Sequence, residues 1–305
     1  ELKKQISKEC NRLAQASLFF GYNRDGGFDM TKYIFLDIDG TLYSPTTNET
    51  PESALRAIHK ARKNGHKVFL CTGRSLAEIV TYLEYDIDGY ILAAGAKVYA
   101  DRKCIYDSPI PKEELQYLKD MINGMKLGYG LEGNAGAYGN ELGYEFLLKY
   151  FSLPNASHEE KVQNAMANCI YPEDAAHEDD EIYKICIYSE DGHEFDQLEK
   201  ALHSQYILTR VIEDPIKKFY GAEITNKDIN KGTGIEKVLE YYHADCSDAI
   251  GIGDSGNDIP MLSYCGTSIA MGNGAESVKA IADYVTKDIL DDGIYHAFKH
   301  FGVID

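Results

Sequence analysis

No apolar stretch in this 305-residue sequence approaches the ~18–20 residues that a membrane-spanning helix needs. Basic residues are few: 31 Lys and Arg stand against 49 Asp and Glu, so the formal net charge is −18 at pH 7. Nucleic acids and anionic membranes attract basic surfaces, and the acid excess therefore speaks against both as partners. A small anionic substrate is compatible with this charge, because a few local cations are enough to bind it.

Paired cysteine motifs are also missing. The 7 cysteines are scattered along the chain, and no two of them form a C-x-x-C pair. An odd and irregularly spaced set favours neither a disulfide framework nor a zinc site, and it is typical of a reducing compartment. We therefore expect a cytoplasmic protein without structural disulfides.

The hydrophobic pattern of the sequence alternates between segments typical of strands and segments typical of helices. Apolar residues make up 44% and charged residues 26% of the sequence, as in ordinary globular proteins. Short apolar runs at 33–38, 67–72 and 90–93 are typical of strands that are buried on both faces. Helical patterns separate them, one beginning at Pro51 and one capped by Ser75. This alternation predicts an α/β fold with a parallel sheet.

The alternation loosens over residues 109–220, where helical and strand patterns are mixed. This mixture indicates an inserted α+β domain. The parallel pattern then resumes with expected strands at 249–252 and 267–271. We therefore expect a core domain made of residues 30–108 and 221–305, with the segment between them as the insert.

The first 29 residues differ from the rest of the chain. They show weak periodicity and end in a glycine-rich segment just before Met30. We expect residues 1–29 to be an N-terminal extension, and an amphipathic docking helix from Leu2 to Ala16 is the alternative.

The first motif that suggests chemistry is Asp37-Ile-Asp39-Gly-Thr-Leu, at the end of the first expected strand. Open α/β sheets bind ligands at the carboxyl ends of their strands. Alternation along a strand would send Asp37 and Asp39 to the same side, and Gly40 lets the chain turn sharply. Taken alone, the pair fits either a reactive carboxylate site or a polar junction between strand and turn.

Two further segments offer groups that bind anions. Thr72-Gly73-Arg74 follows a strand and precedes an expected helix, so it fits an anion site or a plain helix-capping turn. Lys231 stands at the start of another expected helix, where it can direct a compact charge at a phosphate or lie solvated on the surface. The P-loop pattern G-x-x-x-x-G-K-[ST] is absent from the sequence.

A fourth motif, Gly251-Ile-Gly-Asp254-Ser-Gly-Asn257-Asp258, contains the dinucleotide pattern G-x-G-x-x-G. We reject a dinucleotide site, because Asp254 would place a negative charge where the pyrophosphate lies and the motif opens the last part of the fold. The segment instead supplies two carboxylates. Together with Asp37 and with carbonyl and water oxygens, Asp254 and Asp258 suit Mg²⁺.

In this order, the motifs resemble those of the haloacid dehalogenase-like (HAD) superfamily hydrolases, subfamily IIB, the Cof-type sugar-phosphate phosphatases. The matching stretches are 34–42, 71–75, 223–231 and 251–262. The resemblance covers residues 30–305 and implies a Rossmann-like parallel core with a type C2 cap as the insert. One departure is Ala94, because many relatives carry asparagine before the Gly-Ala pair that follows.

The resemblance also implies roles for single residues. Asp37 would be the nucleophile that forms an aspartyl phosphate, and Asp39 the general acid and base. The phosphoryl oxygens would be bound by Thr72, Gly73, Lys231 and Asn257. Mg²⁺ would be held by Asp37, the backbone carbonyl of Asp39, Asp254 and Asp258. Arg74 fits a structural ion pair as well as a substrate contact.

The sequence thus predicts a Mg²⁺-dependent phosphatase of small phosphorylated metabolites, in particular sugar phosphates. A hexose phosphomutase, which returns the phosphoryl group to another hydroxyl, is the alternative enzyme. A non-catalytic phosphometabolite-binding protein is the alternative of a different class. Because all four motifs lie outside 109–220, we expect the insert to set substrate preference.

Overall fold

The computed structural model describes residues 31–150 and 155–305. The extension expected at 1–29, and the alternative helix within it, lie outside these residues. The described chain divides into two compact units, which we call the core unit and the cap unit. The core unit takes the described residues up to Gly73 together with Tyr82–Asp107 and Ile229–Asp305, and the cap unit takes Arg74–Thr81 and Ser108–Asp228.

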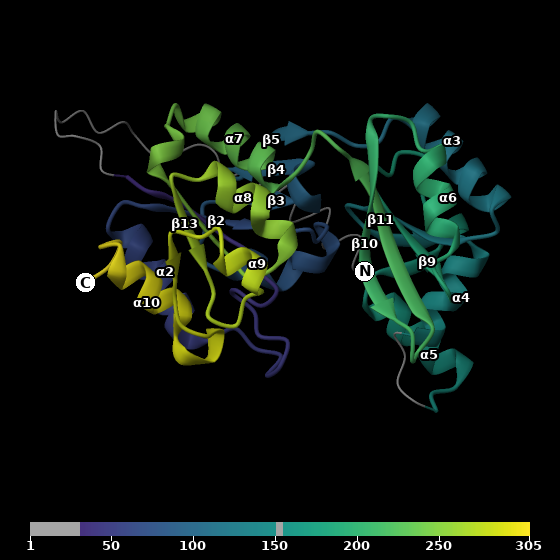
Figure 1. Ribbon diagram of the computed structural model, residues 1–305, viewed down its shortest axis with the longest axis horizontal. Coiled ribbons are helices and arrows are strands. Elements are labelled where there is room, and N and C mark those ends of the chain that lie inside the picture. The colour runs from purple at the N-terminus through teal and green to yellow at the C-terminus, as the bar shows by residue number, and fades with distance from the viewer. Residues whose placement is uncertain (1–30, 151–154) are drawn as a thin grey trace. The chain divides into compact units, whose positions relative to one another are not determined.

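Within the described residues, the core unit is built on an eight-stranded sheet in the order β14-β13-β12-β1-β2-β3-β4-β5 (Figure 1). Neighbours from β14 to β3 run parallel, and β4 and β5 are added antiparallel. Because β12, β1 and β2 are adjacent, the residues that follow these three strands meet at one edge of the sheet. The strands are β1 (Tyr33–Leu36), β2 (Lys67–Cys71), β3 (Gly89–Leu92), β4 (Lys97–Ala100), β5 (Lys103–Asp107), β12 (Ala249–Gly253), β13 (Thr267–Ala270) and β14 (Tyr284–Val285).

Helices cover both faces of this sheet (Figure 1). On one face α7 packs against β3, β4 and β5, and α8 packs against β12 and β13. On the other face α2 packs against β2 and α10. The helices are α2 (Glu52–Lys63), α7 (Lys231–Tyr242), α8 (Ile259–Tyr264), α9 (Glu276–Lys279) and α10 (Gly293–His300).

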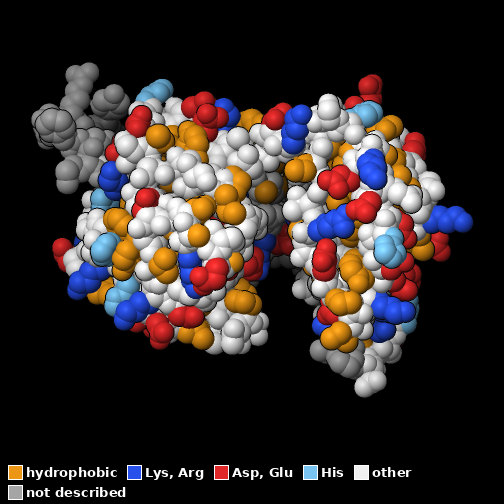
Figure 2. Space-filling view, viewed as in Figure 1, with side chains coloured by type: hydrophobic (Ala, Val, Ile, Leu, Met, Phe, Trp, Pro, Cys, Tyr) orange, Lys and Arg blue, Asp and Glu red, His pale blue; other side chains and the backbone are white. Residues whose placement is uncertain are grey.

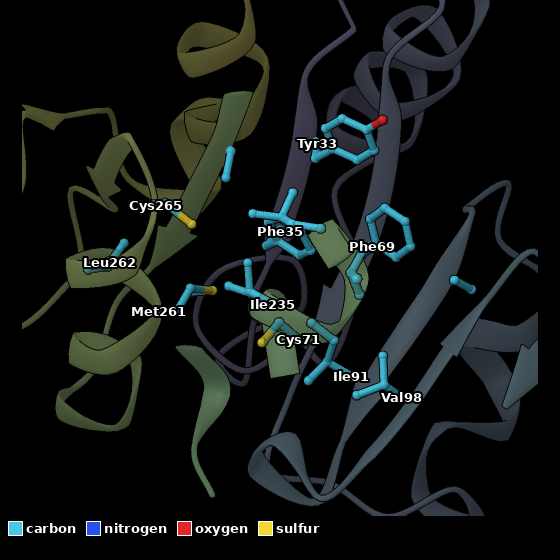
Figure 3. Close-up of a cluster of buried hydrophobic side chains, with 14 of the residues drawn as sticks. Tyr33, Phe35, Phe69, Cys71, Ile91, Val98, Ile235, Met261, Leu262 and Cys265 are labelled. Carbon is cyan, nitrogen blue, oxygen red and sulfur yellow. The ribbon is translucent and has the colours of Figure 1, made fainter. Parts of the chain in front are cut away.

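A buried hydrophobic cluster joins the sheet to α7 and α8 (Figure 3). Phe35 and Phe69 are fully buried and stack with their ring centroids 5.3 Å apart. Ile235 of α7 and Met261 and Leu262 of α8 pack against these strands. Burying a side chain of this size stabilises the fold by ~1.5–3 kcal/mol. The cluster therefore fixes the start of α7, and the turn before α8, at the edge of the sheet.

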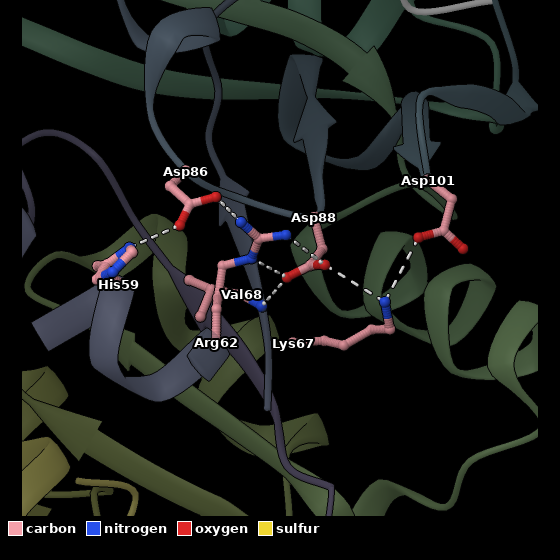
Figure 4. A network of polar contacts seen from close by, with 7 residues as sticks. All are labelled: His59, Arg62, Lys67, Val68, Asp86, Asp88 and Asp101. Carbon is pink, nitrogen blue, oxygen red and sulfur yellow. Dashed lines mark hydrogen bonds and ion pairs between the residues drawn. The ribbon is translucent and has the colours of Figure 1, made fainter. Parts of the chain in front are cut away.

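A polar network ties α2 to the opposite, amino-terminal edge of the sheet (Figure 4). Asp88 lies just before β3, and its carboxylate accepts hydrogen bonds from Arg62 Nε at 2.8 Å and from the Val68 N–H at 2.9 Å. Lys67 Nζ lies 3.3 Å from the same carboxylate. These contacts fix the position of α2 relative to β2 and β3, and we assign the network a structural role.

Within the described residues, the cap unit is built on a six-stranded sheet in the order β10-β11-β9-β6-β7-β8. Its strands pair antiparallel except β7 and β8. The strands are β6 (Gly128–Gly133), β7 (Gly136–Gly139), β8 (Ile170–Pro172), β9 (Ile182–Ser189), β10 (Tyr206–Asp214) and β11 (Phe219–Asn226). The predicted fold class, a parallel α/β core with an inserted α+β cap, is confirmed.

The two faces of the cap sheet differ. One face packs against α3 and α6 through a hydrophobic cluster that includes Leu118, Phe195, Tyr129, Ile185 and Ile187. On the other face α4 approaches β6 closely, since a Cβ on Gly143 would lie 2.1 Å from the Tyr129 carbonyl oxygen. The cap helices are α3 (Lys112–Gly124), α4 (Glu141–Tyr150), α5 (His158–Ala167) and α6 (Glu194–Ala201).

Two details differ from the expectations. The segment after Ser75 forms 3₁₀ turns, η1 (Ala77–Glu84), instead of an α-helix. Ile79, Val80 and Thr81 follow one another there, and such β-branched residues lower helix preference. The boundary expected at 220 falls inside β11, because the pairing of β11 with β10 continues to Asn226.

Basic and acidic side chains are intermixed on the visible faces of the two units (Figure 2). None of the helices in the described residues combines the length and the apolar composition that a membrane crossing requires.

Candidate active site

Four charged side chains meet at the carboxyl edge of the core sheet. Asp37 directly follows β1, Lys231 begins α7, and Asp254 and Asp258 follow β12. Lys231 Nζ lies 2.5 Å from Asp37 Oδ1 and 2.5 Å from Asp258 Oδ1. One carboxylate oxygen each from Asp37, Asp254 and Asp258 can be chosen so that all lie within 4.8 Å of one another, a spacing suited to a shared metal ion.

The charges of this buried group do not balance one another. Asp37, Asp258 and Lys231 are almost completely removed from solvent, and one ammonium faces three carboxylates. Burial raises the pKa of Asp37 to about 8, and the charges of Asp258 and Asp254 add to this effect while Lys231 opposes it. Burial likewise raises the pKa of Asp254 to about 6, with the charge of Asp258 as the next cause. Surplus negative charge of this kind favours a proton or an added cation.

Lys231 stays charged in this setting. Burial alone would lower its pKa, but the carboxylates of Asp37 and Asp258 raise the pKa well above its ordinary value. Asn230 sets the position of this lysine, because its side chain accepts hydrogen bonds from the N–H groups of Gly232 and Thr233. This N-cap makes Lys231 the first residue of α7.

Backbone contacts orient Asp254 and Asp258. Asp258 Oδ2 accepts hydrogen bonds from the N–H groups of Asp254 and Ser255 at 2.9 and 3.0 Å. Gly40 has a φ of +84°, and a Cβ on it would lie 2.3 Å from Asp254 Oδ2. Only glycine fits this backbone conformation and this close approach without strain.

The remaining residues singled out in the sequence lie outside this buried group. Asp39 is exposed, and its backbone forms an isolated β-bridge with that of Tyr43. The alternation argument does not extend to Asp39, because β1 already ends at Leu36. Asn257 is exposed, and its Oδ1 accepts a hydrogen bond from Ser255 Oγ at 2.9 Å.

Thr72 and Gly73 follow β2, next to the strand that Asp37 follows. Thr72 is buried, and its backbone donates to the Ile91 carbonyl and accepts from the Ala94 N–H. Arg74 is counted with the cap unit, and its Nη1 donates to the backbone carbonyl of Glu78 at 3.5 Å.

Sequence reasoning missed Asn273, which holds the turn after Asp39. Its Nδ2 donates to the Gly40 carbonyl at 2.7 Å, and its Oδ1 accepts from the Ile289 N–H at 2.9 Å. The signal was its place two residues after the strand expected at 267–271, at the same edge of the sheet. A Gly-Asn-Gly turn without a further chemical pattern did not distinguish this side chain from an ordinary turn residue.

A profile of the family described as haloacid dehalogenase-like hydrolase matches residues 34–298. The structure is similar to that of the HAD subclass IIB sugar phosphatase BT4131, with a TM-score of 0.67, 30% identity and coverage of 90% of this chain and 100% of that one. It is also similar to BT1666 from Bacteroides thetaiotaomicron, a phosphatase of the HAD superfamily, with a TM-score of 0.72, 28% identity and coverage of 93% and 100%.

Among curated proteins, YkrA of Bacillus subtilis (strain 168) is 28% identical over 275 residues, which cover 90% of this chain and 99% of YkrA. The 5-amino-6-(5-phospho-D-ribitylamino)uracil phosphatase YitU of the same organism is 25% identical, with coverage of 88% and 96%. The chain therefore belongs to the haloacid dehalogenase-like hydrolases, among the phosphatases of subclass IIB.

Proposed function

We propose that this protein is a Mg²⁺-dependent phosphatase that hydrolyses sugar phosphates through an aspartyl phosphate on Asp37. The observation that carries the proposal is the buried contact of Asp37 and Asp258 with Lys231, beside Asp254. A carboxylate can approach the anionic phosphoryl group only where positive charge offsets their repulsion. Lys231 supplies one such charge next to Asp37.

The carboxylates fit a small divalent cation in number and in charge. Asp37, Asp254 and Asp258 leave a surplus of negative charge that Lys231 alone does not balance. Mg²⁺ takes a few carboxylate and carbonyl oxygens and completes its ligand set with water. We infer that these three residues and the backbone carbonyl of Asp39 hold it. When bound, the ion neutralises charge on the phosphoryl oxygens.

In the proposed mechanism, hydrolysis takes place in two successive displacements at phosphorus. An oxygen of Asp37 attacks phosphorus, the bond from phosphorus to the sugar oxygen breaks, and Asp39 gives that oxygen a proton. Asp39 next takes a proton from a water molecule, which attacks phosphorus and releases Asp37. The Thr72 hydroxyl, the Gly73 N–H, the Asn257 amide and the Lys231 ammonium bind the phosphoryl oxygens.

The substrate class is supported by two relatives. BT4131 is a sugar phosphatase, and YitU acts on a compound that carries a phosphoribityl chain. Both names point to phosphate esters of hydroxyl-rich molecules.

A product analysis separates a phosphatase from a phosphomutase. The wild-type protein is given one hexose monophosphate in ¹⁸O water, with and without a trace of the hexose bisphosphate. We expect free phosphate as the main product in both mixtures, and this phosphate should carry the label. Isomerised sugar phosphate that forms only with the bisphosphate would establish the mutase instead. Binding of the ester without turnover would establish the non-catalytic alternative.

We expect Mg²⁺ to stabilise the protein more as the pH rises. When the pKa of a carboxyl is higher in the folded state than in the unfolded state, the free energy of unfolding falls as the pH rises from the unfolded-state pKa to the folded-state pKa. Asp37 has a raised pKa of about 8 and Asp254 one of about 6, so the metal-free site is destabilised across this range. Because metal binding displaces these protons, the Tm increase on adding Mg²⁺ should be larger at pH 8 than at pH 5.5.

Thermal unfolding with EDTA or with Mg²⁺ at the two pH values measures this effect. The Asp254→Asn variant serves as the control and should show a smaller dependence on pH. An equal Tm increase at both pH values in the wild type would contradict the assignment of the metal to these carboxylates.

We expect Asn273→Ala to slow hydrolysis by about tenfold to a hundredfold. The variant loses the hydrogen bonds to the Gly40 carbonyl and from the Ile289 N–H, and these fix the turn that carries Asp39. Steady-state kinetics well below the Tm should show the loss mainly in kcat. Thr286→Ala is the matched control, because it removes a buried 2.7 Å bond to the Gly293 carbonyl without touching Gly40. Equal losses of kcat in both variants would mean that Asn273 acts only through stability.

A further inference from the structure

The turn that carries Asp39 is closed by backbone hydrogen bonds to Tyr43. The Ile38 carbonyl accepts hydrogen bonds from the N–H groups of Leu42 at 2.9 Å and of Tyr43 at 2.7 Å. The Gly40 N–H donates to the Tyr43 carbonyl at 2.9 Å, and the β-bridge joins the backbones of Asp39 and Tyr43. These bonds couple the position of Asp39 to that of Tyr43.

Aromatic side chains hold Tyr43 in its place. Its half-buried ring meets the ring of Tyr82 edge to face, with the ring centroids 6.5 Å apart and an interplanar angle of 87°. Tyr82 is buried, and its ring packs in the same way on Tyr85, at 5.4 Å and 79°. We call Tyr43, Tyr82 and Tyr85 the tyrosine clamp.

The tyrosine clamp holds both ends of a short hairpin formed by residues 44–49. Tyr43 precedes this hairpin and contacts Tyr82. Thr50 follows the hairpin, and its Oγ1 accepts a hydrogen bond from the Tyr85 hydroxyl at 3.1 Å. All of these residues belong to the core unit, so the contacts act within the unit that contains the buried charged group.

Asp39 depends on such anchors more than the buried carboxylates do. It is exposed, so close packing does not orient it, whereas Asp37 is buried against Lys231. Proton transfer requires the acid to lie within hydrogen-bond reach of the oxygen that receives the proton. A displacement of about 1 Å can lower the rate by about a hundredfold. The turn is therefore a place where a remote contact can act on the reaction.

We propose that the tyrosine clamp positions Asp39 for proton transfer to the leaving group, with Tyr43 and Tyr82 as positioning residues. This inference rests on the proposed function, since it concerns the general acid of that reaction. A loosened clamp leaves Asp37 and Lys231 in place, because the hydrophobic cluster fixes β1 and α7. Attack at phosphorus then persists while proton donation weakens, so esters with basic leaving groups should lose the most activity.

The test compares kcat/KM for phenyl phosphate and for 4-nitrophenyl phosphate. The two esters bind through the same phosphoryl and phenyl groups, but nitrophenolate departs readily without a proton and phenolate does not. The parameter kcat/KM reports the first displacement, in which the leaving group departs. The ratio of phenyl to nitrophenyl phosphate should fall by about tenfold in Tyr43→Leu and in Tyr82→Leu, and by about a hundredfold in Asp39→Asn.

Two further variants separate positioning from stability. Tyr43→Phe keeps the ring that lies against Tyr82, so its ratio should stay within twofold of the wild type. Tyr242→Leu is the matched control, because it removes an edge-to-face contact with Phe69 at 6.0 Å, next to Lys67 at the amino-terminal edge of the sheet. It should lower the Tm and leave the ratio unchanged. Tyr43 is only half-buried, so Tyr43→Leu retains the test if Tyr82→Leu does not fold.

The outcomes separate this inference from the proposed function. A lowered ratio in Tyr43→Leu that returns in Tyr43→Phe supports the tyrosine clamp. Ratios within twofold of the wild type in the leucine variants of the clamp, with a lowered ratio in Asp39→Asn, overturn the clamp and leave the phosphatase proposal standing. A ratio as low in Tyr242→Leu as in Tyr43→Leu also overturns the clamp, because the effect would then follow stability. An unchanged ratio in Asp39→Asn overturns the clamp together with the role of Asp39, and a wild type that hydrolyses neither ester overturns both proposals.

Discussion

The Asp37→Asn variant is expected to lose hydrolysis of 4-nitrophenyl phosphate by about ten-thousandfold or more, the scale on which enzymes lose activity with their nucleophile. An amide is a poor nucleophile at phosphorus, and it also provides a weaker ligand for a divalent cation. The loss should appear in kcat with Mg²⁺ present in excess. Initial rates over a range of ester concentrations measure it directly.

The same variant should fold at least as stably as the wild type. The amide cannot ionise, so Lys231 keeps Asp258 as its charged close partner, and the free-energy cost of ionising the buried Asp37 carboxyl, whose pKa is raised to about 8, disappears. Thermal unfolding with EDTA should therefore show an equal or higher Tm, as is common when a strained active site is neutralised. Asp248→Asn, which removes a partly exposed partner of Lys32, is the control and should keep full activity. Turnover within tenfold of the wild type in Asp37→Asn would rule out Asp37 as the nucleophile.

Replacing Lys231 by methionine should damage both activity and stability. Asp37 and Asp258 each lose a contact of 2.5 Å, and both stay buried next to each other without a cation. Removing one partner of a buried ion pair costs about 3–5 kcal/mol of stability. Losing one positive group that faces the phosphoryl oxygens lowers kcat by about a hundredfold to a thousandfold.

A second change separates these two effects of Lys231. The double variant Lys231→Met/Asp258→Asn removes the lysine together with one of its carboxylates, so part of the lost stability should return. Activity should not return, because no ammonium faces the phosphoryl group. Urea unfolding and steady-state rates of the single and double variants measure the two quantities. Recovery of activity together with stability would show that Lys231 acts only by holding the fold.

The sequence predicted the parallel α/β fold of the core because its signals are local. The apolar runs that became β1, β2 and β12 are short, strongly hydrophobic and flanked by turn residues. The chemistry-bearing residues follow these strands directly, so the parallel topology alone places Asp37, Thr72 and Asp254 at one edge. In the cap, the glycines and alternating residues of β6 to β8 gave no comparable signal.

The contacts within the site depend on features that the sequence does not display. The burial of Lys231, and its shared contact with Asp37 and Asp258, follow from the packing of α7 on the sheet. Asn273 reaches Gly40 across 233 positions of the chain, and no local pattern reports such a contact. The contacts of Lys184 with Glu132 and Glu223 were missed for the same reason, because these residues come from three strands that only the cap sheet brings together.

The most direct test of the central claim is to detect the phosphoryl group on Asp37 itself. The Asp39→Asn variant should form the aspartyl phosphate from an activated aryl ester and discharge it slowly, because the general base for the attacking water is missing. Rapid acid quench followed by mass spectrometry of peptides should then find one phosphoryl adduct, on the peptide that contains Asp37. Hydroxylamine, which cleaves acyl phosphates, should remove the adduct. Phosphate release by this variant without any adduct on Asp37, or with an adduct on another residue, would contradict the account.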